Sequence, residues 1–416
     1  MATAHLTSTE PRSLLRDGGF RRLFAAAIGS TLGTEISHVA LPLLAVMALH
    51  ATAGQVGLLA TLSTLPFLLI GLPAGAWVDR VRRRGVMIAA DLARGLLMAS
   101  LPVAWWLGRL TIEQLYLTVL LAGAATVFFD VASLSYLPHL VTRRRVQEGN
   151  SALVSVYAGG SVAGNSAGGF LVQLLTAPAT VAVDAVSYLW SAACLAGIRR
   201  PEPRPEANGD ARLARDIRDG LTFVLEHPLL RSIAVKGALT NLAIQVTVTM
   251  LPVLFVGELG LPAGILGAYL AVGGVGTFLG ARASGRIGRR LGQGRTPWIL
   301  GLVMAPLVFL VPLIEPGPWL WAAMGAWLAV TFGVGVDNVV LVSFRQRCTP
   351  DRLLGRMNAT MRFLLTGALA VGAGLGGLVG QLVSVRAALW VGAAVLAVSW
   401  LPLFFSPMRT MRDFPG

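Results

Sequence analysis

The chain has 416 residues, of which 55% are hydrophobic and 13% are charged, and its mean hydropathy is +0.70. Soluble domains carry about 25% charged residues, so this composition excludes a soluble globular protein. The formal net charge of +14 at pH 7 could indicate a nucleic-acid partner, but the arginines lie in short loops between long apolar runs, which leaves no soluble basic domain to hold a duplex. We therefore expect an all-α polytopic membrane protein that binds no nucleic acid.

Twelve apolar runs are long enough to cross a bilayer, which takes roughly 20 residues per helix. They are predicted at residues 22–49, 55–78, 86–107, 114–137, 151–175, 180–198, 232–256, 263–283, 297–313, 319–344, 358–383 and 387–405. The first six runs form an N-terminal bundle over 22–198, and the last six form a C-terminal bundle over 231–405. Residues 1–21 and 406–416 are expected to be cytoplasmic tails, and 199–230 a cytoplasmic linker.

The linker changes character along its length. It opens with RRPEPRPE, a proline-rich composition typical of linkers, and then Leu213, Ile217, Leu221 and Val224 recur at helical spacing. This second part predicts an amphipathic helix that lies on the membrane surface.

Arginine is distributed unequally between alternate loops. Five alternate loops are arginine-rich, at 80–84, 143–145, 199–218, 286–295 and 345–356. The loops between them hold only Arg109 and Arg386. Because cytoplasmic loops carry the excess of positive charge, both termini are predicted to be cytoplasmic, in a bacterial-type inner membrane.

The two predicted bundles repeat one another in sequence. A shift of 210 positions aligns Gly57 with Gly267, and a shift of 207 aligns Asp130 with Asp337. Two six-helix halves joined by a cytoplasmic linker are typical of secondary transporters built from parallel repeats.

The turn after the second predicted helix carries GAWVDRVRRR, residues 75–84. It resembles the motif G-x-x-x-D-[RK]-x-G-[RK]-[RK] that follows the second helix of major facilitator superfamily transporters. The matching residues are Gly75, Asp79, Arg80, Arg83 and Arg84. Arg82 stands where the family usually has glycine. The resemblance covers essentially the whole chain and implies the twelve-helix fold of this superfamily, with two pseudo-symmetric bundles that alternate access to a central cavity.

A glycine-rich stretch, GSVAGNSAGG at 160–169, lies in the fifth predicted helix. It resembles the antiporter signature of drug-exporting members, G-x-x-x-G-P-x-x-G-G. The residues on this pattern are Gly160, Gly164, Asn165, Gly168 and Gly169, with Asn165 in place of the proline. Small residues let helices approach closely. The stretch is therefore either an exporter signature packed against the other half or plain helix packing.

Glu35 lies in the middle of the first predicted helix. Acids inside a membrane usually face a polar cavity or a partner, and His38, three positions on, shares its helix face. Several proton-driven multidrug exporters of the superfamily carry an acid in this helix, so the resemblance implies that Glu35 couples transport to protons. The alternative is a structural carboxyl group bonded to Thr34 or Ser37.

Two polar residues of the seventh predicted helix, Asn241 and Gln245, are candidates for substrate contacts. Gln245 is the repeat equivalent of Glu35, so the acid is confined to the N-terminal half.

The resemblance also implies a cytoplasmic gate. In relatives with the motif at 75–84, an acid of the fourth helix pairs with an arginine of the motif, so Asp130 is expected to pair with Arg83 or Arg84. Asp79 is expected at the N-terminus of the eleventh predicted helix, where the helix dipole favours an anion.

Further acids within the membrane have structural or unassigned roles. Asp337 with Arg286 or Arg289 is predicted to be a weaker, pseudo-symmetric copy of the gate. Asp91 and Arg94 are spaced to pair on one helix face, while Asp184 has no assigned role.

The chain most resembles the branch of macrolide-efflux and siderophore-export proteins. The residues that carry this resemblance are DLARG at 91–95 and GLTFVLEHPLLR at 220–231. A monomeric, non-enzymatic exporter of amphipathic or hydrophobic small molecules is expected, driven by protons across the lipid bilayer. No nucleotide-binding loop or Cys/His cluster indicates a cofactor or a metal. An importer, a lipid flippase and a non-transporting membrane sensor stay open as alternatives.

Overall fold

The computed structural model describes residues 14–78, 80–142, 145–199, 202 and 213–412. Its long elements are helices, as the composition predicts. Those of the N-terminal half are α1 (Gly18–Leu49), α2 (Ala53–Val78), α3 (Arg83–Trp106), α4 (Ile112–Leu140), α5 (Val146–Leu175) and α6 (Ala177–Ala196). After α7 (Leu213–Glu226) come α8 (Pro228–Pro252), α9 (Ala263–Leu291), α10 (Thr296–Val308), α11 (Pro318–Arg347), α12 (Asp351–Leu382), α13 (Val385–Val398) and the short α14 (Leu401–Phe404).

Within the described residues, eleven segments are long and apolar enough to cross a membrane. They include every predicted span except α5, which is 30 residues long but rich in glycine, serine and asparagine. Helix α5 packs mainly against α1 and α9. A helix that faces protein on several sides needs fewer apolar residues than one that faces lipid. With α5, the structure agrees with the twelve predicted spans.

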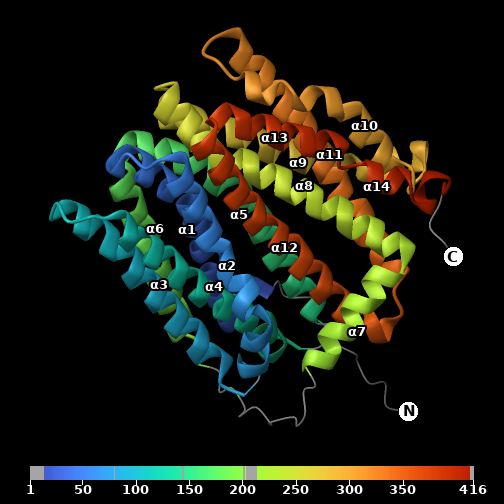
Figure 1. The fold of residues 1–416 in the computed structure, drawn as a ribbon. Coiled ribbons are helices and arrows are strands. Elements are labelled where there is room, and N and C mark those ends of the chain that lie inside the picture. The colour runs from blue at the N-terminus through green and yellow to red at the C-terminus, as the bar shows by residue number, and fades with distance from the viewer. Residues whose placement is uncertain (1–13, 79, 143–144, 200–201, 203–212, 413–416) are drawn as a thin grey trace, which may run out of the picture.

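The helices form two bundles that lie side by side (Figure 1). In the N-terminal half α1 packs on α5 and α6, and α3 packs on α4 and α6. In the C-terminal half α8 packs on α12 and α13, and α9 packs on α11. Two helix pairs join the halves, α2 with α12 and α5 with α9. The space between these pairs holds the candidate site.

Helix α1 begins earlier than the hydropathy predicts. The carboxylate of Asp17 caps it, since one Asp17 oxygen accepts hydrogen bonds from the backbone N–H groups of Gly19 at 2.8 Å and Phe20 at 3.1 Å. Phe20 is fully buried. Part of the predicted tail is therefore the first turn of α1, whereas residues 1–13 lie outside the described residues.

The linker between the bundles contacts both of them. Glu202 accepts hydrogen bonds from the backbone N–H groups of Arg83 at 2.8 Å and Arg84 at 3.1 Å, which caps the N-terminus of α3. On the other side, α7 packs against α12 and α8, and Asp219 forms an ion pair with Arg356 at 3.0 Å. The helix predicted on the membrane surface thus also covers protein, with Val224 fully buried.

Two glycine crossings bring the halves together at one end of the molecule. We call it the arginine-poor end because its loops lack the arginine runs, and the other end the arginine-rich end. Gly57 of α2 lies against Gly377 of α12, and Gly169 of α5 lies against Gly267 of α9. A Cβ atom placed on Gly169 would lie 2.5 Å from the Cα of Gly267. Backbones this close leave no room for a side chain between the paired helices, and we describe the arginine-poor end as closed by these contacts.

A glutamine accompanies each glycine crossing, and we call these two contacts the glutamine latches. The side-chain oxygen of Gln173 accepts a hydrogen bond from the backbone N–H of Gly264 at 3.0 Å. The side-chain oxygen of Gln381 accepts one from Gly54 at 3.1 Å. Gln173 and Gln381 are 208 positions apart, and Gly54 and Gly264 are 210 apart, so the sequence repeat places the same latch on both sides.

Candidate functional site

A cavity of about 1250 Å³ lies between the halves. Its wall is formed by α1, α2, α4, α5, α8, α9, α11 and α12 and is mostly apolar. Ligand pockets for drug-sized molecules usually enclose about 300–1,000 Å³, so this cavity has room for a larger organic molecule or for a ligand together with water. Polar side chains on the wall include His38, Asn165, Gln245 and Asn338.

Glu35 does not line the cavity itself, but it contacts Asn165 and His38, which do. Its Oε2 accepts a hydrogen bond from Asn165 Nδ2 at 3.2 Å and lies 3.8 Å from His38 Nδ1. The side chain of Glu35 is 21% exposed and that of His38 is 63% exposed. The predicted acid of α1 and the asparagine of the α5 motif therefore form one polar group beside the cavity.

The hydroxyl groups considered as alternative partners of Glu35 bond elsewhere. Thr34 Oγ1 donates to the Ser30 carbonyl oxygen at 2.8 Å and lies 2.9 Å from the Tyr188 hydroxyl. Ser37 donates to Asp184. Glu35 thus contacts Asn165 and His38 and not these hydroxyl groups.

The glycines of the α5 motif mostly serve packing inside the N-terminal half. Their neighbours on α1 are Thr31 for Gly160, Glu35 for Gly164 and Ile36 for Gly168. A Cβ atom on Gly164 would lie 2.5 Å from the Cβ of Glu35, so the glycine permits the approach that lets Asn165 reach the acid. Of the motif's glycines, Gly169 makes the crossing to the other half.

Asn241 and Gln245 have different surroundings. Gln245 lines the cavity, and its Nε2 donates to Thr249 Oγ1 at 3.1 Å. Asn241 Nδ2 donates to the Leu365 carbonyl oxygen at 3.1 Å and so ties α8 to α12. Of the two predicted substrate contacts, the structure places Gln245 on the cavity wall.

Asp130 pairs with a different arginine from the one expected. Its carboxylate lies 3.8 Å from the guanidinium of Arg362 on α12, and that guanidinium lies 5.9 Å from the ring centre of Phe67. The expected pairing with Arg83 or Arg84 is wrong in this conformation. Asp130 instead links the two halves.

The arginines of the motif at 75–84 hold the turn against neighbouring helices. Arg83 Nη1 lies 2.7 Å from His139 Nε2, and Arg84 Nε donates to the Leu195 carbonyl oxygen at 2.9 Å. Arg80 is exposed, and Gly75 has open space where a Cβ would stand. Asp79 lies outside the described residues, so its predicted contact with α12 stays a prediction.

Asp337 forms a buried ion pair with Lys236, the single lysine of the chain. Arg286 and Arg289 are exposed, so the expected pairing of Asp337 with either of them is wrong. The repeat explains the difference from Asp130. A shift of 210 places Lys236 over Ala26, so the position that supplies the ion-pair partner of Asp337 holds alanine in the N-terminal half.

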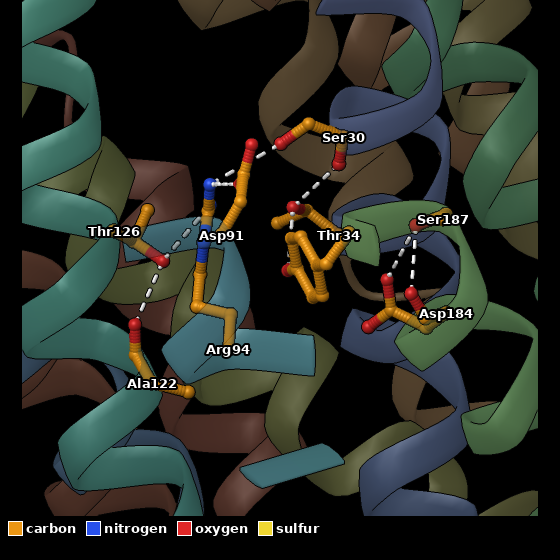
Figure 2. Close-up of polar contacts among 9 residues, drawn as sticks. Ser30, Thr34, Asp91, Arg94, Ala122, Thr126, Asp184 and Ser187 are labelled. Carbon is orange, nitrogen blue, oxygen red and sulfur yellow. Dashed lines mark hydrogen bonds and ion pairs between the residues drawn. The ribbon is translucent and has the colours of Figure 1, made fainter. Parts of the chain in front are cut away.

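Arg94 is a fully enclosed cation within the N-terminal half (Figure 2). It forms the predicted ion pair with Asp91 and donates to Thr126 Oγ1 and Ser30 Oγ, each at 3.4 Å. Its guanidinium carbon also lies 4.4 Å from the ring centres of both Phe129 and Tyr188. The i, i+3 spacing predicted the pair, but the two rings come from other helices and carry no local sequence signal.

Asp184 is the buried acid that the sequence left without a role. It has no exposed surface. Ser37 of α1 donates to one of its carboxylate oxygens, and Ser187 Oγ donates to the other at 3.1 Å (Figure 2 shows Asp184 with Ser187). An acid near the outer end of a predicted span was the available signal, and its contact with cavity-lining Ser37 could not be derived from spacing.

Two repeated helical bundles around a central cavity, closed at one end by matching contacts, define a membrane transporter of the alternating-access kind. The family model of the Major Facilitator Superfamily matches residues 23–365, and the chain belongs to this superfamily. The predicted resemblance, fold and transporter class are confirmed, and the family is one of transporters, not enzymes.

Characterised relatives include two bacterial efflux proteins. The multidrug efflux pump Tap of Mycobacterium bovis is 28% identical over 318 residues, which cover 73% of this chain and 74% of that protein. The enterobactin exporter EntS of Salmonella choleraesuis is 26% identical over 402 residues, which cover 95% of this chain and 94% of that protein.

Solved structures with the same fold include a bacterial homologue of the iron transporter ferroportin in an inward-facing state. The TM-score is 0.75 at 16% identity, with 94% of this chain and 99% of that chain covered. A bacterial homologue of the lysosomal transporter Spinster, inward-facing and unoccupied, matches with a TM-score of 0.73 at 15% identity over 92% and 96% of the two chains. These likenesses concern the fold alone.

Proposed function

We propose that this protein is a proton-coupled exporter of amphipathic or hydrophobic small organic molecules in the bacterial cytoplasmic membrane. The observation that carries the proposal is the polar group formed by Glu35, Asn165 and His38 beside a large, mostly apolar cavity. The names of its relatives support export, since one is a multidrug efflux pump and another an enterobactin exporter. The arginine-rich end then faces the cytoplasm, where positive loops are favoured.

The polar group is suited to exchange a proton with the cavity. An ionised Glu35 accepts the hydrogen bond from Asn165 and attracts a protonated His38, whereas a neutral Glu35 loses most of that attraction. Proton binding therefore changes how firmly α1 is held to α5. Because α5 also forms a glycine crossing with α9, this change acts directly on a helix that closes the arginine-poor end.

The cavity wall supports the choice of substrate class. Aromatic side chains of Phe67, Phe278 and Trp327 stand among aliphatic ones, and Gln245 and Asn338 add neutral hydrogen-bonding groups. Apolar walls with a few polar groups favour organic molecules over ions. A cationic molecule would gain further from the nearby carboxylate of Glu35.

The gate at the cytoplasmic end is proposed to include Asp130 with Arg362. This pair joins α4 to α12 across the halves at 3.8 Å. Exposed ion pairs are weak, with about 0–1 kcal/mol each, so such a contact can break and re-form during transport.

Ethidium efflux from cells that express the wild type or Glu35→Gln tests the proposed function. We expect an uncoupler to abolish wild-type efflux, and Glu35→Gln to reduce proton-driven efflux by about tenfold or more, which corresponds to at least about 1.4 kcal/mol of coupling energy. Glu113→Gln is the matched control, because Glu113 is an exposed acid in the first turn of α4 and does not line the cavity.

Normal efflux by Glu35→Gln would show that Glu35 is structural. Ethidium accumulation in intact cells that depends on the proton gradient would instead identify an importer. Inverted vesicles repeat the measurement with the opposite orientation and separate the two directions.

A further inference from the structure

The carboxyl group of Asp184 occupies a site built to hold it. Gly33 of α1 faces Asp184, and a Cβ atom placed on Gly33 would overlap the Asp184 carboxylate and the Ser187 hydroxyl. Ser37 donates to one oxygen of the Asp184 carboxyl group, and the Ser187 hydroxyl is shared between the other oxygen at 3.1 Å and the Asp184 carbonyl oxygen at 2.8 Å. No cation is bonded to this carboxyl group among the described residues.

The charges around Asp184 do not balance if every acid is ionised. The charged and titratable groups that act on it are Arg94 of α3, His38 of α1 and Tyr188 of its own helix. Arg94 is the fixed cation of this group, and it is already paired with Asp91. A second buried carboxylate without its own cation is costly, so the interior readily accommodates Asp184 with a bound proton.

Ser37 connects Asp184 to the cavity. It lines the cavity wall and donates its hydroxyl hydrogen to Asp184. A hydroxyl group can accept one hydrogen bond while it donates another. It can therefore take a proton from a hydronium ion in the cavity as its own proton passes to the Asp184 oxygen.

The C-terminal half supplies an internal comparison for this arrangement. A shift of 210 places Thr247 at the position of Ser37, and a shift of 208 places Gly392 at the position of Asp184. A Cβ atom on Gly392 would lie 2.8 Å from Thr247 Oγ1, so the two positions face one another in both halves. Helices α8 and α13 thus pack in the same way without an acid, and packing alone does not require Asp184.

We propose that Asp184 is a second proton-binding residue, loaded from the central cavity through Ser37. The proposal rests on the proton coupling proposed above and adds a second exchangeable proton beside the one at Glu35. The step transfers one proton and no electrons. The cavity hydronium ion becomes water, Ser37 ends as it began, and the Asp184 carboxylate becomes a neutral acid.

Infrared difference spectroscopy of the purified full-length protein after a pH jump tests this assignment without any transported substrate. We expect the wild type to gain absorption from protonated carboxyl groups on acidification. Asp184→Asn should lose one component of this gain, and Glu35→Gln should lose another. A spectrum of folded Asp184→Asn that matches the wild type would overturn the proposal.

The two serines provide a second test with a matched pair, which also serves if Asp184→Asn fails to fold. Ser37→Ala removes the hydroxyl that reaches the cavity, and Ser187→Ala removes a hydroxyl that bonds the same carboxyl group from its own helix. We expect Ser37→Ala to slow protonation about tenfold or more, since a positioned proton-transfer group contributes roughly 10²–10⁴ in rate, and Ser187→Ala to keep nearly the wild-type rate. Equal rates for the two variants would contradict the relay.

Failure of this proposal and failure of the proposed function give different results. If the infrared component of Asp184 is present but the protein exports no ethidium, Asp184 binds a proton and the proposed function is overturned. With normal proton-driven efflux and no Asp184 component, coupling runs through Glu35 and the present assignment is overturned.

Discussion

The two halves share their packing and differ in their acids. Both carry a glycine crossing and a glutamine latch, at positions related by shifts of 208 and 210. Where the N-terminal half has Glu35 and Asp184, however, the C-terminal half has Gln245 and Gly392. The comparison teaches that closure of the arginine-poor end depends equally on both halves, whereas the candidate proton chemistry is confined to one.

A second difference between the halves concerns an aspartate that occurs at the same repeat position in both. Asp130 and Asp337 are equivalent in sequence, but Asp337 is neutralised inside its half by Lys236, and Asp130 pairs across the halves with Arg362. The repeat position that holds the buried partner Lys236 in the C-terminal half holds Ala26 in the N-terminal half, and the pair of Asp130 is the more exposed of the two.

Loss of Lys236 is expected to have the largest effect on stability. Lys236→Ala leaves Asp337 buried without its cation, and breaking a buried pair in this way costs about 3–5 kcal/mol. Thermal unfolding in detergent measures the loss. In the Lys236→Ala background, Asp337→Asn should restore part of it because it removes the unpaired charge, and a further loss of similar size would contradict the pairing.

A methyl group at a glycine crossing is expected to have an intermediate effect. Gly169→Ala places a Cβ against the backbone of Gly267, which cannot move aside as a side chain can, and overpacking costs about 1–3 kcal/mol. Because the strain exists when the arginine-poor end is closed, the variant should shift the protein towards opening there. Cysteine accessibility at that end measures the shift.

Gly71→Ala is the matched control for the crossing. It makes the same change on α2 at a position where a Cβ meets nothing within 4 Å. Equal accessibility in the two variants would show that the crossing does not limit closure.

Loss of Arg362 is expected to have the smallest effect on stability. Arg362→Ala removes a pair whose arginine side chain is 58% exposed, and exposed pairs contribute about 0–1 kcal/mol. Because this pair is part of the proposed gate at the arginine-rich end, its loss should let protons leak faster through the protein. Proton leak into proteoliposomes that contain the variant measures this effect. A destabilisation as large as that of Lys236→Ala would remove the contrast between the two equivalent acids.

The sequence predicts contacts along one helix better than contacts between helices. The pair of Asp91 with Arg94 and the neighbours Glu35 and His38 follow from i, i+3 spacing. Hydropathy also predicts the spans, and the resemblance of residues 75–84 to a family motif predicts the superfamily. The partners of Asp130 and Asp337 depend on how each helix is rotated and tilted, which short-range periodicity does not specify.

The role of α5 shows the same limit. Its motif predicts close packing, but three of its glycines contact α1 in the same half and Gly169 contacts the other half. Asp184 could not be connected to Ser37 from sequence, because the two residues are 147 positions apart and lie on different helices.

The glycine crossings have a consequence for the balance between the open and closed states. Ordering a long side chain costs up to about 2 kcal/mol of rotamer entropy, whereas glycine has no side chain to order. Closing the arginine-poor end over Gly57, Gly377, Gly169 and Gly267 therefore restricts few rotamers beyond those of the two latching glutamines. The loss of side-chain entropy therefore disfavours the closed state only slightly. A modest difference in free energy, such as that from one bound proton or one bound molecule, is then enough to decide which state prevails.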